Sequence, residues 1–115
     1  MAENRSQSRM HVVWNGAIRL PTLQIVQIKV LNLTDVGLQF SCSENLRIGQ
    51  KYEMQIHVPD INGGSNTTIV PCFAECLYVI LSGREFRVGA KCSGLSPQNN
   101  ELLLKWSERC ARGVA

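Results

Sequence analysis

Apolar and polar residues alternate along most of the chain between residues 11 and 93. This period of two is typical of β-strands that turn one face toward a core. Residues 67–81 are mostly apolar at odd and at even positions alike, which predicts a long strand covered on both faces. The other predicted strands have apolar faces formed by Val12, Trp14, Ile18 and Leu20, by Val26, Ile28 and Val30, by Leu38, Phe40 and Cys42, by Met54, Ile56 and Val58, and by Phe86, Val88, Ala90 and Cys92.

The pattern changes after residue 95. Ser96 and Pro97 are typical of a helix start, with a hydroxyl at the N-cap and proline at the first helical position. Apolar residues then recur at helical spacing, which predicts an amphipathic helix over about residues 97–110. The predicted fold class is mainly β, a six-stranded antiparallel β-barrel with one C-terminal α-helix over an open end or a seam.

The composition suits a single domain with a core, since 44% of the 115 residues are apolar and 18% are charged. No apolar run approaches the roughly 20 residues that span a bilayer, and residues 1–9 are polar, unlike a secretory leader. We therefore expect a cytoplasmic protein without membrane insertion. A net charge of +3 is too mild to indicate duplex DNA, and we expect neither DNA nor RNA as a partner. A small barrel that binds single strands is an alternative, although only 6% of the residues are aromatic.

The sequence favours a binding module over an enzyme. It contains no nucleophile elbow, no metalloprotease motif and no phosphate-cradling glycine loop, so only a composite catalytic site is left as an alternative. An odd number of cysteines fits a reducing compartment, and Cys72 and Cys76 lack the C-x-x-C spacing of a zinc knuckle. We expect no metal site, and cysteines used as small buried apolar residues. The cysteines are Cys42, Cys72, Cys76, Cys92 and Cys110.

Two short elements carry candidate chemistry. Arg5 and Arg9 form R-x-x-x-R in the polar N-terminal segment, and guanidinium groups grip phosphate, match the edge of guanine and stack on bases. Asn32, Thr34 and Gly37 form N-L-T-D-V-G between the second and third strands. The amide and the hydroxyl point the same way at a strand end, and glycine lets the chain turn and a ligand approach. Taken singly, the elements fit solvated charges and an ordinary β-turn; together they predict a site for a compact, anionic, guanine-bearing ligand on the outer wall of the barrel.

With these two elements in this order, the sequence resembles the PilZ domain, the bacterial receptor module for cyclic di-GMP. The family pattern is R-x-x-x-R before the first strand and [DN]-x-S-x-x-G after the second. The resemblance covers nearly the whole chain, including L-R-I-G at residues 46–49 and R-V-G-A-K-C at residues 87–92. Thr34 replaces the usual serine and keeps the hydroxyl, and Cys92 replaces the usual phenylalanine.

The resemblance implies a stand-alone PilZ-like split barrel over residues 11–115, preceded by a flexible arm, residues 1–10. It implies that Arg5 and Arg9 contact guanine edges and phosphates, that Asn32 and Thr34 hydrogen-bond a guanine, and that Gly37 holds the turn open. The ligand would be cyclic di-GMP, with no further cofactor. A monomer or weak dimer would pass the signal in trans to an unidentified protein effector. The alternative is an adaptor of the same fold that binds proteins without the nucleotide.

Overall fold

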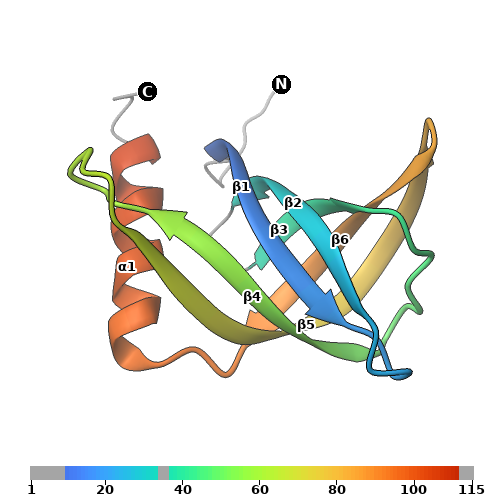
Figure 1. Cartoon of the computed structure of the whole chain (residues 1–115). Helices are drawn as coiled ribbons and strands as arrows, with labels where there is room; N and C mark the ends of the chain where they lie inside the picture. Colours follow the sequence, from blue (N-terminus) through green and yellow to red (C-terminus); the bar gives the residue numbers. More distant parts are fainter. Residues whose placement is uncertain (1–9, 34–36, 112–115) are drawn as a thin grey trace.

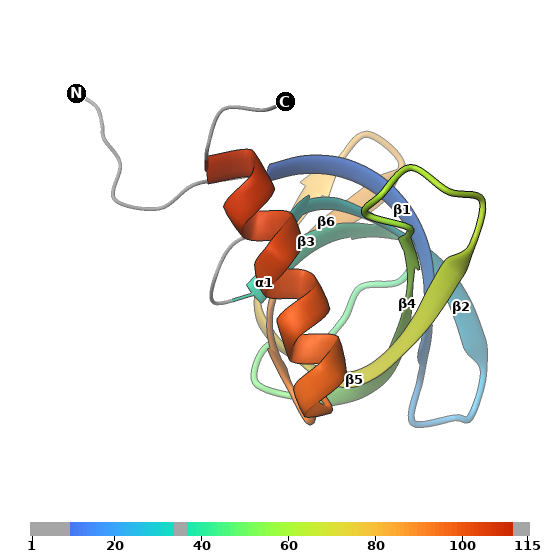
Figure 2. The ribbon, with the colours of Figure 1, turned by 90° about the vertical axis from the view of Figure 1, so that its left-hand side faces the viewer.

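Within the described residues, 10–33 and 37–111, six antiparallel strands close into a barrel in the order β1-β2-β3-β6-β5-β4 (Figure 1). A single described helix lies across one end of this barrel (Figure 2). The predicted fold class is therefore confirmed. The elements are β1 (Met10–Arg19), β2 (Ile25–Leu33), β3 (Gly37–Cys42), β4 (Lys51–Pro59), β5 (Thr67–Ser82), β6 (Glu85–Ser93) and α1 (Pro97–Ala111).

The apolar face of each strand fills the interior of the barrel. In β2, β3 and β4 the buried side chains fall at alternate positions, as the period of two predicts. Cys42, Cys72 and Cys76 are buried among them, and Cys92 is half-buried, so these thiols pack as small apolar side chains. The largest side chains that are less than 2% exposed are Phe40, Ile18, Ile56, Val30, Val58, Val70 and Val88.

The helix α1 begins at a capped turn and packs over the end of β1. The Ser96 Oγ accepts a hydrogen bond from the Asn99 N–H at 3.1 Å, which confirms the predicted N-cap. Leu103 is buried, and the Trp106 ring meets Trp14 edge-on, with centroids 5.4 Å apart and an interplanar angle of 68°. No helix in the described part of the chain is long and apolar enough to cross a membrane.

Irregular register in the sheet determines which residues reach the outer wall. The pairing shifts between Val30 and Asn32 in β2 and between Cys76 and Tyr78 in β5. An extra residue in one strand changes which side chains face the core, from the even-numbered to the odd-numbered ones or the reverse. In β5 the buried side chains are even-numbered up to Cys76, and the next one packed on the core is Val79. Asn32 and Tyr78 each follow such a shift, and both lie outside the core.

The outer face of β5 is exposed, so the prediction that this strand is covered on both faces was wrong. Ile69 and Ile80 are each 54% exposed, and Leu81 is 68% exposed. The reason is that the wall of the barrel is one layer thick, and its inner face alone encloses the core. The helix covers an end of the barrel and leaves this wall open (Figure 2).

Candidate functional site

A chain of side-chain hydrogen bonds crosses the outer wall of the barrel from β2 to β5. The Nδ2 of Asn32 donates to the Oε1 of Gln39 at 2.6 Å, and the Nε2 of Gln39 donates to the hydroxyl of Tyr78 at 3.0 Å. Asn32 lies opposite Gln39, while Gln39 and Tyr78 both lie opposite Gly89 of β6. We call Asn32, Gln39 and Tyr78 the Asn32 row. The row joins β2, β3 and β5 across the backbone of β6.

Two glycines allow the strands of this wall to come together as they do. A β-carbon built on Gly89 would lie 2.1 Å from Cε2 and 2.2 Å from Cζ of Tyr78, so the ring lies directly over the β6 backbone. Gly37, the first residue of β3, has the same requirement, because its β-carbon would lie 2.2 Å from the carbonyl oxygen of Ala90. Any larger residue at either position would push the neighbouring strand or ring away.

Asn32 brings to this wall an acceptor that no other described residue uses. Its Nδ2 is held by Gln39, but its Oδ1 is buried and has no hydrogen-bond partner among the described residues. Leaving a buried acceptor unpaired costs about 1–3 kcal/mol. A ligand N–H brought to this oxygen would recover that cost without displacing a hydrogen bond from any described residue.

The register of β1 fixes where the chain enters the barrel. Met10 lies opposite Leu33, and His11 lies opposite Asn32. The segment that precedes Met10 is therefore joined to the barrel at the end of β2 that carries Asn32. Gly37 begins β3 at this same end, since Leu33 pairs with the residue that follows it.

The structure thus brings together two of the five predicted site residues, Asn32 and Gly37, at one end of the β2–β3 pair. The other three, Arg5, Arg9 and Thr34, lie outside the described residues.

Exposed cations flank the Asn32 row. Lys29 of β2 and Arg87 of β6 lie on the two sides of Ser41 in β3. Lys91 of β6 is also exposed, with Glu75 opposite it in β5. Glu85 lines the same surface as Lys29 and Ser41, so three cations stand against two carboxylates, and the remaining positive balance favours an anionic ligand.

Gln39 and Gly89 were not among the residues predicted for the site. Gln39 is one of several polar residues that alternate along the strands, and nothing in the sequence distinguishes it. Gly89 did carry a signal, since glycine inside a strand marks a bulge or a close approach of another group. What the sequence does not give is the register that places Tyr78 over it.

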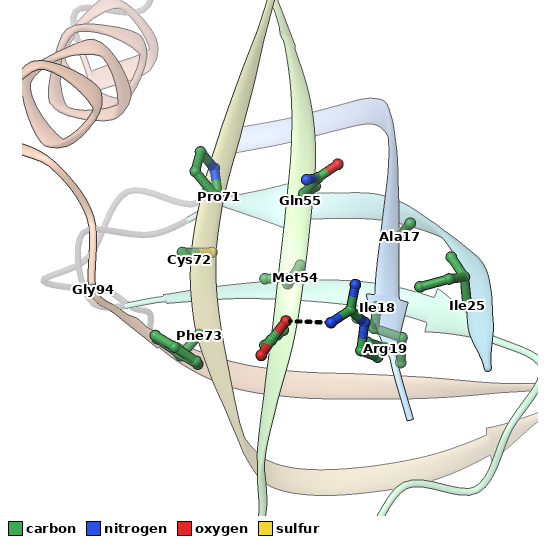
Figure 3. Close-up of a pocket in the computed structure, with 11 residues that line it drawn as sticks. Ala17, Ile18, Arg19, Ile25, Met54, Gln55, Pro71, Cys72, Phe73 and Gly94 are labelled. Carbon is green, nitrogen blue, oxygen red and sulfur yellow. Dashed lines mark ion pairs between the residues drawn. The ribbon is translucent and has the colours of Figure 1, made fainter. Parts of the chain in front are cut away.

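A separate pocket of about 480 Å³ lies between β1, β4 and β5 (Figure 3). Arg19 and Glu53 form an ion pair at 3.3 Å in it, but both side chains are about half exposed, so the pair contributes little to stability. Cys72 also lines the pocket, and a hydrogen bond with the Cys92 thiol lowers the pKa of Cys72 and raises the pKa of Cys92. None of the Asn32 row lines this pocket, and the described residues contain no cluster of three or more metal-ligating side chains.

No protein-family model and no curated protein matches the sequence. Solved structures do match the fold. The Bacillus subtilis inhibitor of motility, MotI/DgrA, superimposes with a TM-score of 0.80 at 13% identity, over 97% of this chain and 53% of that one. The PilZ domain of Escherichia coli YcgR, solved with c-di-GMP, superimposes with a TM-score of 0.67 at 14% identity, over 97% of this chain and 95% of that one.

The chain has the PilZ fold. The YcgR chain in its crystal structure with c-di-GMP matches as well, with a TM-score of 0.71 at 12% identity, over 97% of this chain and 48% of that one. This PilZ-fold chain therefore spans about half the length of MotI and of that YcgR chain. The resemblance noted in the sequence is confirmed at the level of the fold.

Proposed function

We propose that the chain is a receptor for cyclic di-GMP and that the ligand lies on the outer wall beside the Asn32 row. In this proposal the protein is a cytoplasmic binding module, not an enzyme. The residues proposed to hold the ligand are Arg5, Arg9, Asn32, Thr34 and Gly37.

The register of β1 against β2 carries the proposal. His11 lies opposite Asn32, so the N-terminal segment starts beside the proposed site. Arg9 is bonded to Met10, and consecutive Cα atoms are about 3.8 Å apart. Arg5 is five residues from Met10 and has a reach of at most about 18 Å. Both guanidinium groups therefore have access to a ligand placed against Asn32.

The chemistry of this wall suits the ligand. A guanine presents N–H donors on one edge, and the Oδ1 of Asn32, which has no partner in the described part of the chain, is an acceptor for one of them. Arginine pairs with the opposite guanine edge and with phosphate oxygens. The exposed Lys29, Arg87 and Lys91 favour the approach of a doubly charged anion.

We propose further that the signal passes in trans to a protein effector. Binding would hold two guanidinium groups against the wall, which changes the charge and shape of the surface that an effector contacts. The affinity for such a partner would then depend on the nucleotide, as linkage between two ligands requires.

Isothermal titration calorimetry with cyclic di-GMP tests the receptor proposal, with GTP and the linear dinucleotide pGpG as control ligands. Arg9→Ala removes charge-assisted hydrogen bonds of about 1.5–3 kcal/mol, so the affinity should fall roughly ten- to a hundredfold. Arg19→Ala is the matched control, because it removes the same charge from an exposed position in the separate pocket. Folded wild-type protein that gives no heat with cyclic di-GMP would overturn the proposal and favour the nucleotide-independent adaptor.

A further inference from the structure

The strand β5 continues past the barrel wall with one backbone edge unpaired. Its pairing with β4 covers residues 67–75 and no further. At Cys76 the N–H donates to the Gln50 carbonyl at 3.0 Å, and the carbonyl accepts from the Gly49 N–H at 2.8 Å. Beyond that point, residues 77–82 pair only with β6 among the described residues. Figure 1 shows this end of the β5–β6 hairpin projecting from the barrel.

The side chains along this free edge are apolar and exposed. Leu77 is 51% exposed, Tyr78 41%, Ile80 54% and Leu81 68%. No charged residue and no proline occurs between residues 76 and 83. Natural proteins usually protect an exposed edge strand with lysine, proline or another charged side chain. Residues 77–82 carry none of these side chains. A bulge, which also protects edges, lies between Cys76 and Tyr78, and the edge that follows it is open to another strand.

We propose that this edge of β5 is a dimerisation surface, on which two copies of the chain pair antiparallel through a two-fold axis. A free edge exposes N–H and carbonyl groups at every second residue, and only another strand satisfies the whole series. A second copy brings an edge of the same length with the same spacing of donors and acceptors. Because the segment is uncharged, self-pairing places no like charges opposite one another, and a charged partner strand would find no complement there.

The geometry of antiparallel pairing selects the register. Two residues that lie opposite one another must both turn their backbone groups toward the partner strand or both turn them away. In a pair of identical strands, the numbers of opposite residues are therefore both odd or both even. An axis through Val79 meets this condition. It places Leu77 opposite Leu81 of the second copy, and aliphatic pairs of this kind stabilise antiparallel ladders. Tyr78 lies opposite Ile80, but its ring is turned the other way, over Gly89 of β6. The pairing ends at Cys76, whose backbone groups are already bonded to residues 49 and 50.

This arrangement stops at two copies. The two-fold axis uses the same β5 edge from each chain, so this edge is filled in the dimer and adds no third copy. The strand order closes the barrel, but the pairing of β1 with β4 covers only residues 16–19 and 53–56, and the pairing of β2 with β3 begins at Lys29. The inference is argued from the β5 edge and not from the proposed nucleotide site, although Tyr78 belongs both to this edge and to the Asn32 row.

Sedimentation velocity of the nucleotide-free chain, from about 1 µM to about 500 µM, tests this interface against two matched variants. Ile80→Lys places an edge-protecting lysine in the free segment. Ile69→Lys makes the same change on the same strand at the same 54% exposure, but where β5 is paired with His57 of β4. We expect a concentration-dependent dimer for the wild type and for Ile69→Lys. For Ile80→Lys we expect a dissociation constant at least about tenfold higher.

Hydrogen–deuterium exchange at the same concentrations reads the backbone pairing directly. Within residues 77–81, the amides that face the free edge, at every second residue, should become more protected as the wild-type concentration rises, and they should not in Ile80→Lys. Circular dichroism confirms that both variants are folded. The proposal is overturned by a wild type that stays monomeric at every concentration, by a dimer that both lysines weaken equally or not at all, or by open-ended growth beyond two copies.

Discussion

The ring of Tyr78 occupies the space that a β-carbon on Gly89 would need. Two ring atoms lie 2.1 and 2.2 Å from that position. Because Gly89 lies opposite both Tyr78 and Gln39, the ring crosses β6 there and its hydroxyl meets the Gln39 side chain at 3.0 Å. A residue without a side chain thus lets β5 contact β3 over the strand between them.

Gly89→Ala should lower the free energy of unfolding by about 1–3 kcal/mol, since overpacking costs of this size follow when a neighbour must move. The Tyr78 ring would have to leave β6 and lose its hydrogen bond with Gln39. Urea denaturation measures the change. In a Tyr78→Ala background the added methyl has room, and the same substitution should cost nothing or stabilise by about 0.5–1 kcal/mol. An equal cost in both backgrounds would show that Tyr78 is not the obstacle.

Gln39→Ala tests whether the Asn32 row orients Asn32 for the proposed ligand. The substitution frees the Nδ2 of Asn32, which Gln39 holds at 2.6 Å. One lost hydrogen bond of about 0.5–1.5 kcal/mol predicts an affinity for cyclic di-GMP that is roughly two- to tenfold weaker by calorimetry. Gln27→Ala, at an exposed position of β2 opposite Ala17, is the control. Equal affinities for the two variants would mean that the row does not position Asn32.

Much of the fold could be predicted because local physics determines it. A period of two in the sequence becomes one buried face in the barrel, and the Ser96 hydroxyl begins α1 where the sequence places it. The helix bounds followed for the same reason, since the change from a period of two to helical spacing comes at the capping residues. That Asn32 and Gly37 lie at the same end of the β2–β3 pair could be predicted, because few residues separate them in the sequence.

The rest depends on register, which local patterns do not carry. The extra residues in β2 and β5 reverse the parity of both strands, and no residue type marks them. The two hydrogen bonds of the Asn32 row join residues that are 7 and 39 positions apart in the sequence. The row therefore forms only when β2, β3, β6 and β5 are aligned side by side. The apolar outer face of β5 was expected to be covered, because the sequence does not reveal that the barrel wall is one layer thick and leaves Ile69 exposed even where β5 pairs with β4.

The contact between the two tryptophans should hold the helix on the barrel. Trp106→Ala removes a half-buried indole that meets Trp14 edge-on, and we expect a loss of about 2–4 kcal/mol in the free energy of unfolding. Leu104→Ala is the control on the same helix, because that side chain is 45% exposed. It should cost less than about 0.5 kcal/mol. Urea denaturation followed by tryptophan fluorescence and by circular dichroism measures both, and similar losses for the two variants would contradict the role of the indole contact.

The thiol of Cys72 should form its thiolate at a lower pH than the other buried cysteines. The hydrogen bond from the Cys92 thiol lowers the pKa of Cys72 below the ordinary 9.0, against the opposing effect of burial. Burial instead raises the pKa values of Cys42 and Cys76. Because the thiolate is the species that is alkylated, iodoacetamide should modify Cys72 with a pH midpoint below those of the other two.

Cys92→Ala removes the donor and leaves only burial, so the alkylation midpoint of Cys72 should move to higher pH. Cys92→Ser is the matched control, since its hydroxyl keeps a donor at nearly the same place and should hold the midpoint low. Peptide-resolved mass spectrometry over a pH series gives the midpoint for each cysteine separately. If the midpoint of Cys72 is the same in Cys92→Ala and in the wild type, the hydrogen bond does not control its ionisation.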